Sequence, residues 1–325
     1  MQRRTFLKTL ASATAALSLP PASFAEAYER DRLGVVLPRR LLGATGEHVT
    51  MLGLGGWHIG RMTEVYAEET IEQAIRGGVR FFDTAESYQK GESERRYGKY
   101  LIPKYRDDIF LMTKSTAKDA KRAREHLEGS LRRMKTDRLD LWQMHTVQNP
   151  ADVDRRIEQG VIDEMVKAKE EGKVRYIGFT GHRQTAAHLR VLKKTEVFQT
   201  CQLPVNCADP HYDSFIEKVM PSLVDQNYGV IAMKTLSNGN FFGRDQKGNP
   251  IPALIPDKIS IRQAIHFVWA LPVSVLITGP DNMEQMKEKC ELARMFLGLD
   301  EQERQDLVDQ VADAAGGPLE YYKRA

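Results

Sequence analysis

The sequence predicts an α/β protein, a (β/α)8 TIM barrel with an N-terminal β-hairpin. Eight short apolar runs alternate with amphipathic stretches along the chain, and repeated strand-then-helix units imply parallel strands in a closed barrel or an open sheet. Ionisable residues follow successive runs, which favours the barrel because its strand ends share one mouth. With 325 residues and 42% hydrophobic content, the chain is long enough for one such domain.

The elements follow one another in the order that this fold requires. Residues 38–51 read as a hairpin ahead of the barrel. The strands are expected at residues 49–55, 79–85, 109–114, 139–145, 174–180, 197–205, 228–234 and 273–279. Helical patterns connect them, most clearly at 120–134 and 153–172, and a long loop around 238–252 delays the helix after the seventh strand. The chain ends in a polar helix expected at 301–317. No linker or low-complexity tract divides the chain after the first forty residues, so we expect a single catalytic domain at 26–325.

Four residues at strand ends are the most informative feature of the chain. Asp83 and Tyr88 follow the second strand, Lys114 ends the third, and His145 ends the fourth. Taken singly, each is better explained as a helix cap, a solvated strand end or a half-buried loop residue. Their joint placement on successive strand ends predicts one shared catalytic site.

The motifs around these residues resemble the aldo-keto reductase superfamily. They are RFFDTAESYQKGESERRYGKYL, IFLMTKS and RLDLWQMHTV, and the resemblance extends from about residue 38 to about residue 297. It implies carbonyl reduction with a nicotinamide cofactor. Tyr88 would donate the proton, and Lys114, paired with Asp83, would lower the phenol pKa from its ordinary value of about 10. His145 would orient the substrate carbonyl.

The same resemblance assigns the cofactor contacts. Thr180 and Gln202 stand where the family holds the nicotinamide carboxamide, Gly181 replaces an asparagine, and Met233 replaces the stacking ring. Further cofactor contacts are predicted at Gly56, Trp57, Asp83, Leu236, Gly279, Gln285 and Glu288. Gly279 and Gln285 occupy positions where basic residues usually grip the adenosine 2′-phosphate, and glutamine does not supply that charge. Lys287 or Arg183 would have to substitute. The expected cofactor is NADP by family habit, or NAD.

The N-terminus resembles a twin-arginine export signal. Arg3 and Arg4 precede a moderately apolar stretch that is shorter than the roughly 20 residues of a membrane span. Residues 1–25 are therefore expected to be cleaved, and the mature protein to be periplasmic, with an uncleaved tail as the alternative. Cleavage removes three basic residues and no acidic one, which cancels the formal charge of +3. The expected partners are a small carbonyl or alcohol substrate and the export machinery, with no nucleic acid and no stable membrane span.

The remaining cysteines and histidines are interpreted as packing residues. Cys201, Cys207 and Cys290 show no metal spacing. Cys201 and Cys207 are most simply buried side chains, although a disulfide between them stays open. His58 and His182 are interpreted as surface or packing residues rather than parts of the mouth. No metal site is predicted.

Three functions are compatible with these patterns. The favoured one is an NAD(P)-dependent oxidoreductase acting on an aldehyde, ketone or sugar. The second is a binding or sensor protein of the same fold that carries the cofactor with little turnover. The third is a barrel lyase or metal-dependent hydrolase, which would need a cluster of metal-binding residues at the strand ends.

Overall fold

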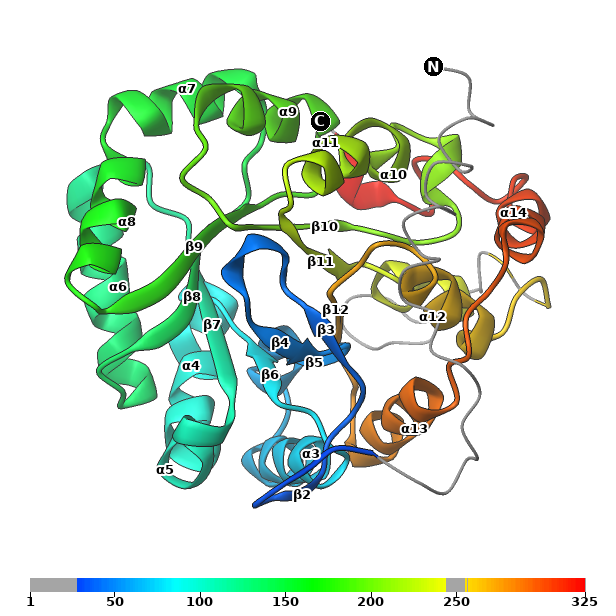
Figure 1. Cartoon of the computed structure of the whole chain (residues 1–325), viewed down its shortest axis with the longest axis horizontal. Helices are drawn as coiled ribbons and strands as arrows, with labels where there is room; N and C mark the ends of the chain where they lie inside the picture. Colours follow the sequence, from blue (N-terminus) through cyan, green and yellow to red (C-terminus); the bar gives the residue numbers. More distant parts are fainter. Residues whose placement is uncertain (1–27, 244–254, 256, 325) are drawn as a thin grey trace.

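The computed structural model describes residues 28–243, 255 and 257–324, and within them eight parallel strands close into a barrel (Figure 1). The strands are β5 (Leu52–Gly55), β6 (Phe81–Asp83), β7 (Phe110–Ser115), β8 (Leu139–Met144), β9 (Val174–Thr180), β10 (Thr200–Pro204), β11 (Gly229–Met233) and β12 (Val275–Thr278). Each strand pairs with the next, and β12 pairs with β5 to close the ring. The predicted TIM barrel and its strands are confirmed.

Helices surround the barrel in Figure 1. They are α2 (Gly56–Ile59), α3 (Glu64–Arg76), α4 (Glu92–Arg96), α5 (Ile102–Tyr105), α6 (Ala120–Met134), α7 (Pro150–Glu158), α8 (Val161–Glu170), α9 (Thr185–Lys194), α10 (Phe215–Lys218), α11 (Met220–Asp225), α12 (Ile261–Trp269), α13 (Met283–Arg294) and α14 (Glu301–Gln310). The prediction of helix at 120–134 is confirmed, whereas two other helix predictions need correction.

The helix predicted at 153–172 is two helices, α7 and α8. Gly160 separates them with a φ of +72°, a left-handed conformation that ends one helix and starts the next. The helix predicted at 301–317 ends at Gln310. The chain then turns, and Gly316 adopts a φ of +113°. At Gly160 the glycine permits a backbone conformation that a continuous helix excludes.

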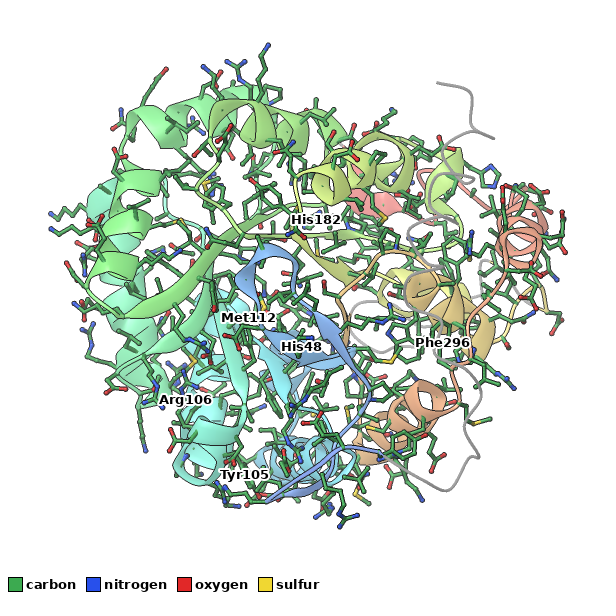
Figure 2. All side chains as sticks on the ribbon, viewed as in Figure 1. His48, Tyr105, Arg106, Met112, His182 and Phe296 are labelled. Atoms are coloured by element: carbon green, nitrogen blue, oxygen red, sulfur yellow. The ribbon has the colours of Figure 1, made fainter. Side chains whose placement is uncertain are left out.

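The N-terminal hairpin closes one end of the barrel. β3 (Arg39–Leu41) and β4 (His48–Thr50) pair antiparallel, as predicted. Two hairpin residues pack inside the barrel with side chains from six strand positions; this cluster comprises Leu42, Val49, Phe81, Phe110, Met112, Leu141, Ile231 and Val275. Met112 lies within the ring of strands in Figure 2. A second short hairpin, β1 (Arg30–Asp31) with β2 (Gly34–Val35), precedes it and was not predicted.

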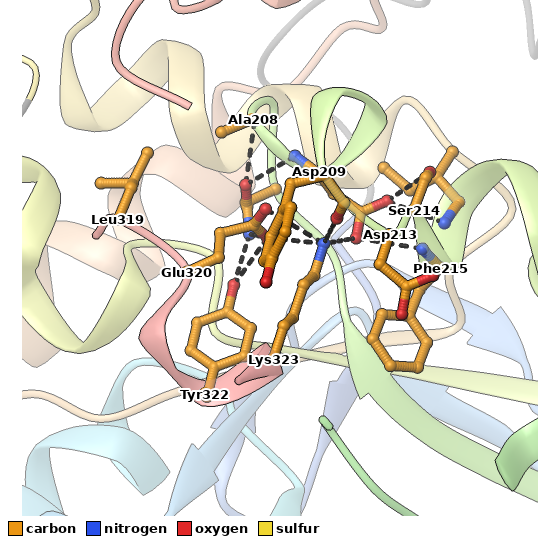
Figure 3. A network of polar contacts seen from close by, with 12 residues as sticks. Ala208, Asp209, Asp213, Ser214, Phe215, Leu319, Glu320, Tyr322 and Lys323 are labelled. Atoms are coloured by element: carbon orange, nitrogen blue, oxygen red, sulfur yellow. Dashed lines mark hydrogen bonds and ion pairs between the residues drawn. The ribbon is translucent and has the colours of Figure 1, made fainter. Parts of the chain in front are cut away.

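The C-terminal segment is held by a buried ion cluster. Lys323, whose side chain is fully buried, lies 2.6 Å from Asp209 and 2.9 Å from Glu320 (Figure 3). It also donates to the carbonyl of Tyr212 at 2.6 Å. The backbone carbonyl oxygen of Tyr322, beside it, accepts a hydrogen bond from Nδ1 of His182, just beyond β9, at 3.2 Å. These contacts place the end of the chain at the carboxyl edge of the barrel.

All three cysteines are free and buried, so no disulfide joins Cys201 and Cys207. In the described ranges no helix is both long and apolar enough to cross a membrane.

Candidate active site

The four predicted catalytic residues meet at the carboxyl edge of the barrel, around Lys114. Its ammonium contacts the carboxylate of Asp83 and donates to the Thr84 carbonyl at 2.8 Å and to the Tyr88 phenol oxygen at 3.1 Å. Asp83 and Lys114 are buried, and Tyr88 and His145 are half-buried. The imidazole of His145 faces the Tyr88 ring, with 5.8 Å between the ring centres.

Local backbone geometry brings these side chains together. β6 ends at Asp83 and lies beside β7, which carries Lys114. Tyr88 begins a 3-10 turn in which Gln89 and Lys90 adopt φ values of +47° and +55°. This tight turn keeps the phenol within reach of the strand ends, and strained backbone of this kind is typical of functional sites.

Gly56 and Trp57, two predicted cofactor contacts, lie at the start of α2, directly after β5, and border the site. A Cβ on Gly56 would lie 2.8 Å from the Asp83 carbonyl oxygen and 2.4 Å from Ser93 Oγ, so only glycine fits there. Trp57, at the start of α2, packs edge-on against Tyr88 with 5.3 Å between ring centres. The aromatic contact limits the motion of the phenol.

Burial controls the ionisation of the site. It raises the pKa of Tyr88 above its ordinary value, although the Lys114 ammonium opposes that rise. Lys114 acts in the expected direction, but burial outweighs it, so the expectation of a Tyr88 pKa below its ordinary value is wrong. Burial opposes the charge on Lys114, but Asp83 and Tyr88 outweigh it and raise the Lys114 pKa. A neutral phenol thus lies beside a stable cation.

His145 is a neutral imidazole. Burial, with the nearby Lys114 charge, lowers the pKa of His145 well below its ordinary value. Its Nδ1 is buried and has no hydrogen-bond partner among the described residues. A neutral ring has one nitrogen that donates and one that accepts, so His145 can donate a hydrogen bond without carrying charge.

The residues predicted to hold the nicotinamide lie next to this group. Gln202 Nε2 donates to Asp83 Oδ2 at 3.1 Å, and Gln202 Oε1 is buried without a partner among the described residues. Thr180 lies opposite Gln202 in the pairing of β9 with β10. A carboxamide would satisfy the free oxygen, because its N–H groups are donors. Met233 ends β11 and is half-buried.

Gly181, where the resemblance led us to expect an asparagine, has no room for a larger side chain. A Cβ at this position would lie 2.7 Å from the Val147 carbonyl oxygen and 2.8 Å from the His188 ring. The space that an asparagine would need is filled by these two neighbours.

A cavity of about 390 Å³ extends from the end of β11 to the N-terminal half of α13. Four of the predicted cofactor contacts line it, namely Leu236, Gly279, Gln285 and Glu288. His58 lines it too and covers Gly279, where a Cβ would lie 2.0 Å from the imidazole Nδ1. The interpretation of His58 as a surface or packing residue is therefore corrected: His58 lines the cavity. Lys287 and Arg183 are not among the described lining residues.

Lys234 is one of the cavity residues that the sequence did not indicate, which also include Thr235 and Asp281. Its Nζ donates to Asn238 Oδ1 at 3.0 Å and lies 5.6 Å from the centre of the Tyr322 ring. Burial lowers the Lys234 pKa to about 8. The φ of Lys234 is +61°, and Ser237, Asn238 and Gly239 also have positive φ. The Asn-Gly dipeptide was the sequence signal for this turn.

A closed parallel barrel with ionisable groups gathered at its carboxyl edge is the architecture of a TIM-barrel enzyme. Comparison with known proteins assigns the family. Residues 51–307 match the model of the Aldo/keto reductase family. The chain is 25% identical to "Uncharacterized oxidoreductase YqkF" of Bacillus subtilis over 290 residues, 78% of this chain and 90% of that protein. It is 31% identical to L-galactose dehydrogenase of Arabidopsis thaliana over 219 residues, 62% of this chain and 66% of that protein.

Solved structures share the fold. Aldo-keto reductase AKR11C1 from Bacillus halodurans superposes with a TM-score of 0.71 at 23% identity, covering 84% of this chain and 96% of that one. An aldo-keto reductase from Klebsiella pneumoniae in complex with NADPH gives a TM-score of 0.66 at 19% identity, covering 90% of this chain and 97% of that one. The chain belongs to the aldo/keto reductase family, a family of oxidoreductases.

Proposed function

We propose that this protein is an NAD(P)-dependent reductase of an aldehyde, ketone or sugar carbonyl, or a dehydrogenase of the corresponding alcohol, with Tyr88 as the general acid or base. The observation that carries the proposal is the ammonium of Lys114, which contacts both Asp83 and Tyr88. A neutral imidazole faces the same phenol. Membership of the family supports the oxidoreductase class.

The described residues fit a nicotinamide cofactor, which supplies or accepts the hydride when it is bound. Gln202 and Thr180 would hold its carboxamide, because Gln202 Oε1 is buried and unpartnered among the described residues and Thr180 lies beside it. Lys234 and the cavity beyond it would hold the phosphates and the adenosine. The NADPH in the Klebsiella pneumoniae structure supports nicotinamide use within this fold.

The chain's own residues account for the proton transfer. Tyr88 gives its proton to the carbonyl oxygen as negative charge develops there. Lys114, 3.1 Å from the phenol oxygen, stabilises the phenolate that is left. Asp83 keeps Lys114 charged and in place. His145 donates a hydrogen bond that orients the carbonyl and stabilises the charge on its oxygen.

Substitution of Tyr88 by phenylalanine tests this assignment. Turnover should fall by about 10²–10⁴, the usual contribution of general acid catalysis, while the dissociation constant of the dinucleotide stays within a few-fold. Tyr105→Phe is the matched control. It also removes a phenol hydroxyl, but that hydroxyl lies outside the site and donates to Glu72 Oε2 at 2.8 Å. Normal turnover in Tyr88→Phe would remove Tyr88 from the mechanism. A wild-type protein that binds dinucleotide but turns over negligibly would favour the sensor alternative.

We further propose that residues 1–25 direct export through the twin-arginine pathway and that the mature protein is periplasmic. The support is the sequence pattern around Arg3 and Arg4, which lies outside the described residues. Replacing both arginines by lysine should leave the full-length chain in the cytoplasm, while the wild type is recovered from the periplasm beginning near Glu26. Equal export of the two proteins would contradict the proposal.

A further inference from the structure

The end of the cavity at α13 is lined by acidic side chains. Asp281 and Glu288 both line it, and the side chains are 42% and 47% exposed. The side chain of Gln285 binds the loop that precedes α13. Its Oε1 accepts a hydrogen bond from the Asp281 backbone N–H at 2.9 Å. Its Nε2 lies 3.4 Å from Asp281 Oδ2. The glutamine thus holds Asp281 in place instead of offering a charge to a ligand.

The two basic side chains at this end, Lys289 and His58, offer no free positive charge to a ligand. Lys289 is buried, and its Nζ lies 2.7 Å from Glu288 Oε2. His58 lies 4.0 Å from Asp281, yet burial lowers the His58 pKa to about 4, which leaves the ring neutral near pH 7. Among the described residues that line the cavity, none is an arginine. Two carboxylates and one paired lysine therefore leave this end with a net negative charge.

The other end of the cavity is suited to phosphate. Lys234 follows Met233 directly at the end of β11, and its only described hydrogen-bond partner is Asn238. Thr235, 5% exposed, lines the cavity with a buried Oγ1 that has no partner among the described residues. Successive residues with positive φ in this turn can direct backbone N–H groups towards an anion. A dinucleotide with its nicotinamide beside Tyr88 would place its phosphates here and its adenosine ribose at α13.

We propose that this protein uses NAD(H) in preference to NADP(H), and that Glu288 and Asp281 make the distinction. The proposal rests on the function proposed above. Carboxylates accept hydrogen bonds from the free hydroxyl groups of an adenosine ribose. A 2′-phosphate at the same place would meet like charges, and the described lining residues offer it no arginine. Lys234 would contact groups common to both dinucleotides and would not discriminate between them.

Equilibrium titration of the purified protein with NAD+ and with NADP+, by calorimetry, tests the preference without any substrate. The dissociation constant for NAD+ should be at least about tenfold lower than that for NADP+. Glu288→Gln should reduce this ratio about tenfold, because it removes one carboxylate and frees Lys289. The double variant Gln285→Arg with Glu288→Gln should invert the preference. Lys234→Met should weaken both dinucleotides by similar factors.

Glu284→Gln is the matched control, because it makes the same charge change on α13 at an exposed residue that does not line the cavity. Tighter binding of NADP+ by the wild type would overturn the inference and leave the proposed function intact. An equal change of the ratio in Glu284→Gln and Glu288→Gln would also overturn it. Binding of neither dinucleotide at millimolar concentration would refute the proposed function, and the inference would fall with it.

Discussion

Replacement of Lys114 by methionine perturbs the electrostatic centre of the site. The ammonium lies 3.1 Å from the Tyr88 oxygen, and unit charges at that separation interact by about 5 kcal/mol at an effective dielectric constant of about 20. Part of this is offset. Burial favours the protonated form of Asp83 once its cation is gone, and a neutral Asp83 no longer raises the Tyr88 pKa. We expect a remainder on the order of 2 kcal/mol, which raises the phenol pKa by about 1–2 units.

The assay is kcat/KM against pH in both reaction directions. In the variant the limb that reports Tyr88 should move to higher pH, and turnover at pH 7 should fall by about 10² or more. Lys99→Met is the control, because that lysine makes an exposed pair with Glu64 at 2.8 Å. An unchanged pH profile with substantial activity would mean that Lys114 is structural, and would refute the reasoning.

The same variant makes a prediction about stability. Breaking a buried ion pair costs about 3–5 kcal/mol when the remaining charge stays ionised. Burial raises the pKa of Asp83 already in the wild type, and loss of Lys114 raises it further. A group whose pKa is higher in the folded state stabilises the fold at low pH and loses that contribution as the pH rises. The deficit in the free energy of unfolding, measured in urea, should therefore shrink as the pH falls from 7 towards 4.

Three further variants, and Lys218→Met as a control for the first, test the structure around the site. Lys323→Met leaves Asp209 and Glu320 buried without their cation, so the free energy of unfolding should fall by about 3–5 kcal/mol. The control is Lys218→Met, because the exposed pair of Lys218 with Asp213 should contribute less than about 1 kcal/mol. A loss of unfolding free energy as large in Lys218→Met as in Lys323→Met would contradict the prediction. His188 is fully buried between Phe179 and Phe215, and burial lowers its pKa to about 4. Its contribution to stability is complete above about pH 6.5 and is lost as the pH falls through 4, by about 3 kcal/mol. His188→Phe should therefore flatten the acid side of the stability curve, and an identical slope would count against this account. Gly181→Asn introduces the residue that the resemblance led us to expect but places its Cβ 2.7 Å from the Val147 carbonyl oxygen. Calorimetry should show weaker dinucleotide binding and a lower Tm, whereas tighter binding would show that the backbone can move aside.

The strands and the catalytic group were predictable from the sequence for a local reason. Each apolar run of the barrel is followed by polar residues within a few positions, and strand ends in this fold share one edge. Asp83, Lys114 and His145 could therefore be assigned to one site from their positions alone. The helix bounds were less predictable, as at Gly160, because a single glycine conformation ends a helix whose apolar pattern continues.

The cofactor end of the site was harder to predict from the sequence, because contacts between distant segments form it. His58 covers Gly279 across the pairing of β5 with β12, and no local pattern indicates that contact. Lys234 was overlooked because a lysine after a strand is usually solvated. Here Tyr322, from the last residues of the chain, lies against it.

The barrel, the family resemblance and the four residues at the mouth could be predicted from the sequence, because all three depend on the order and spacing of residues along the chain. The ionisation of Tyr88, the burial of Lys234 and Lys323, and the acidic lining at α13 emerge only in the folded protein. These properties depend on how much water the fold removes from a group and which charges it places nearby. Both are set by residues far apart in the chain.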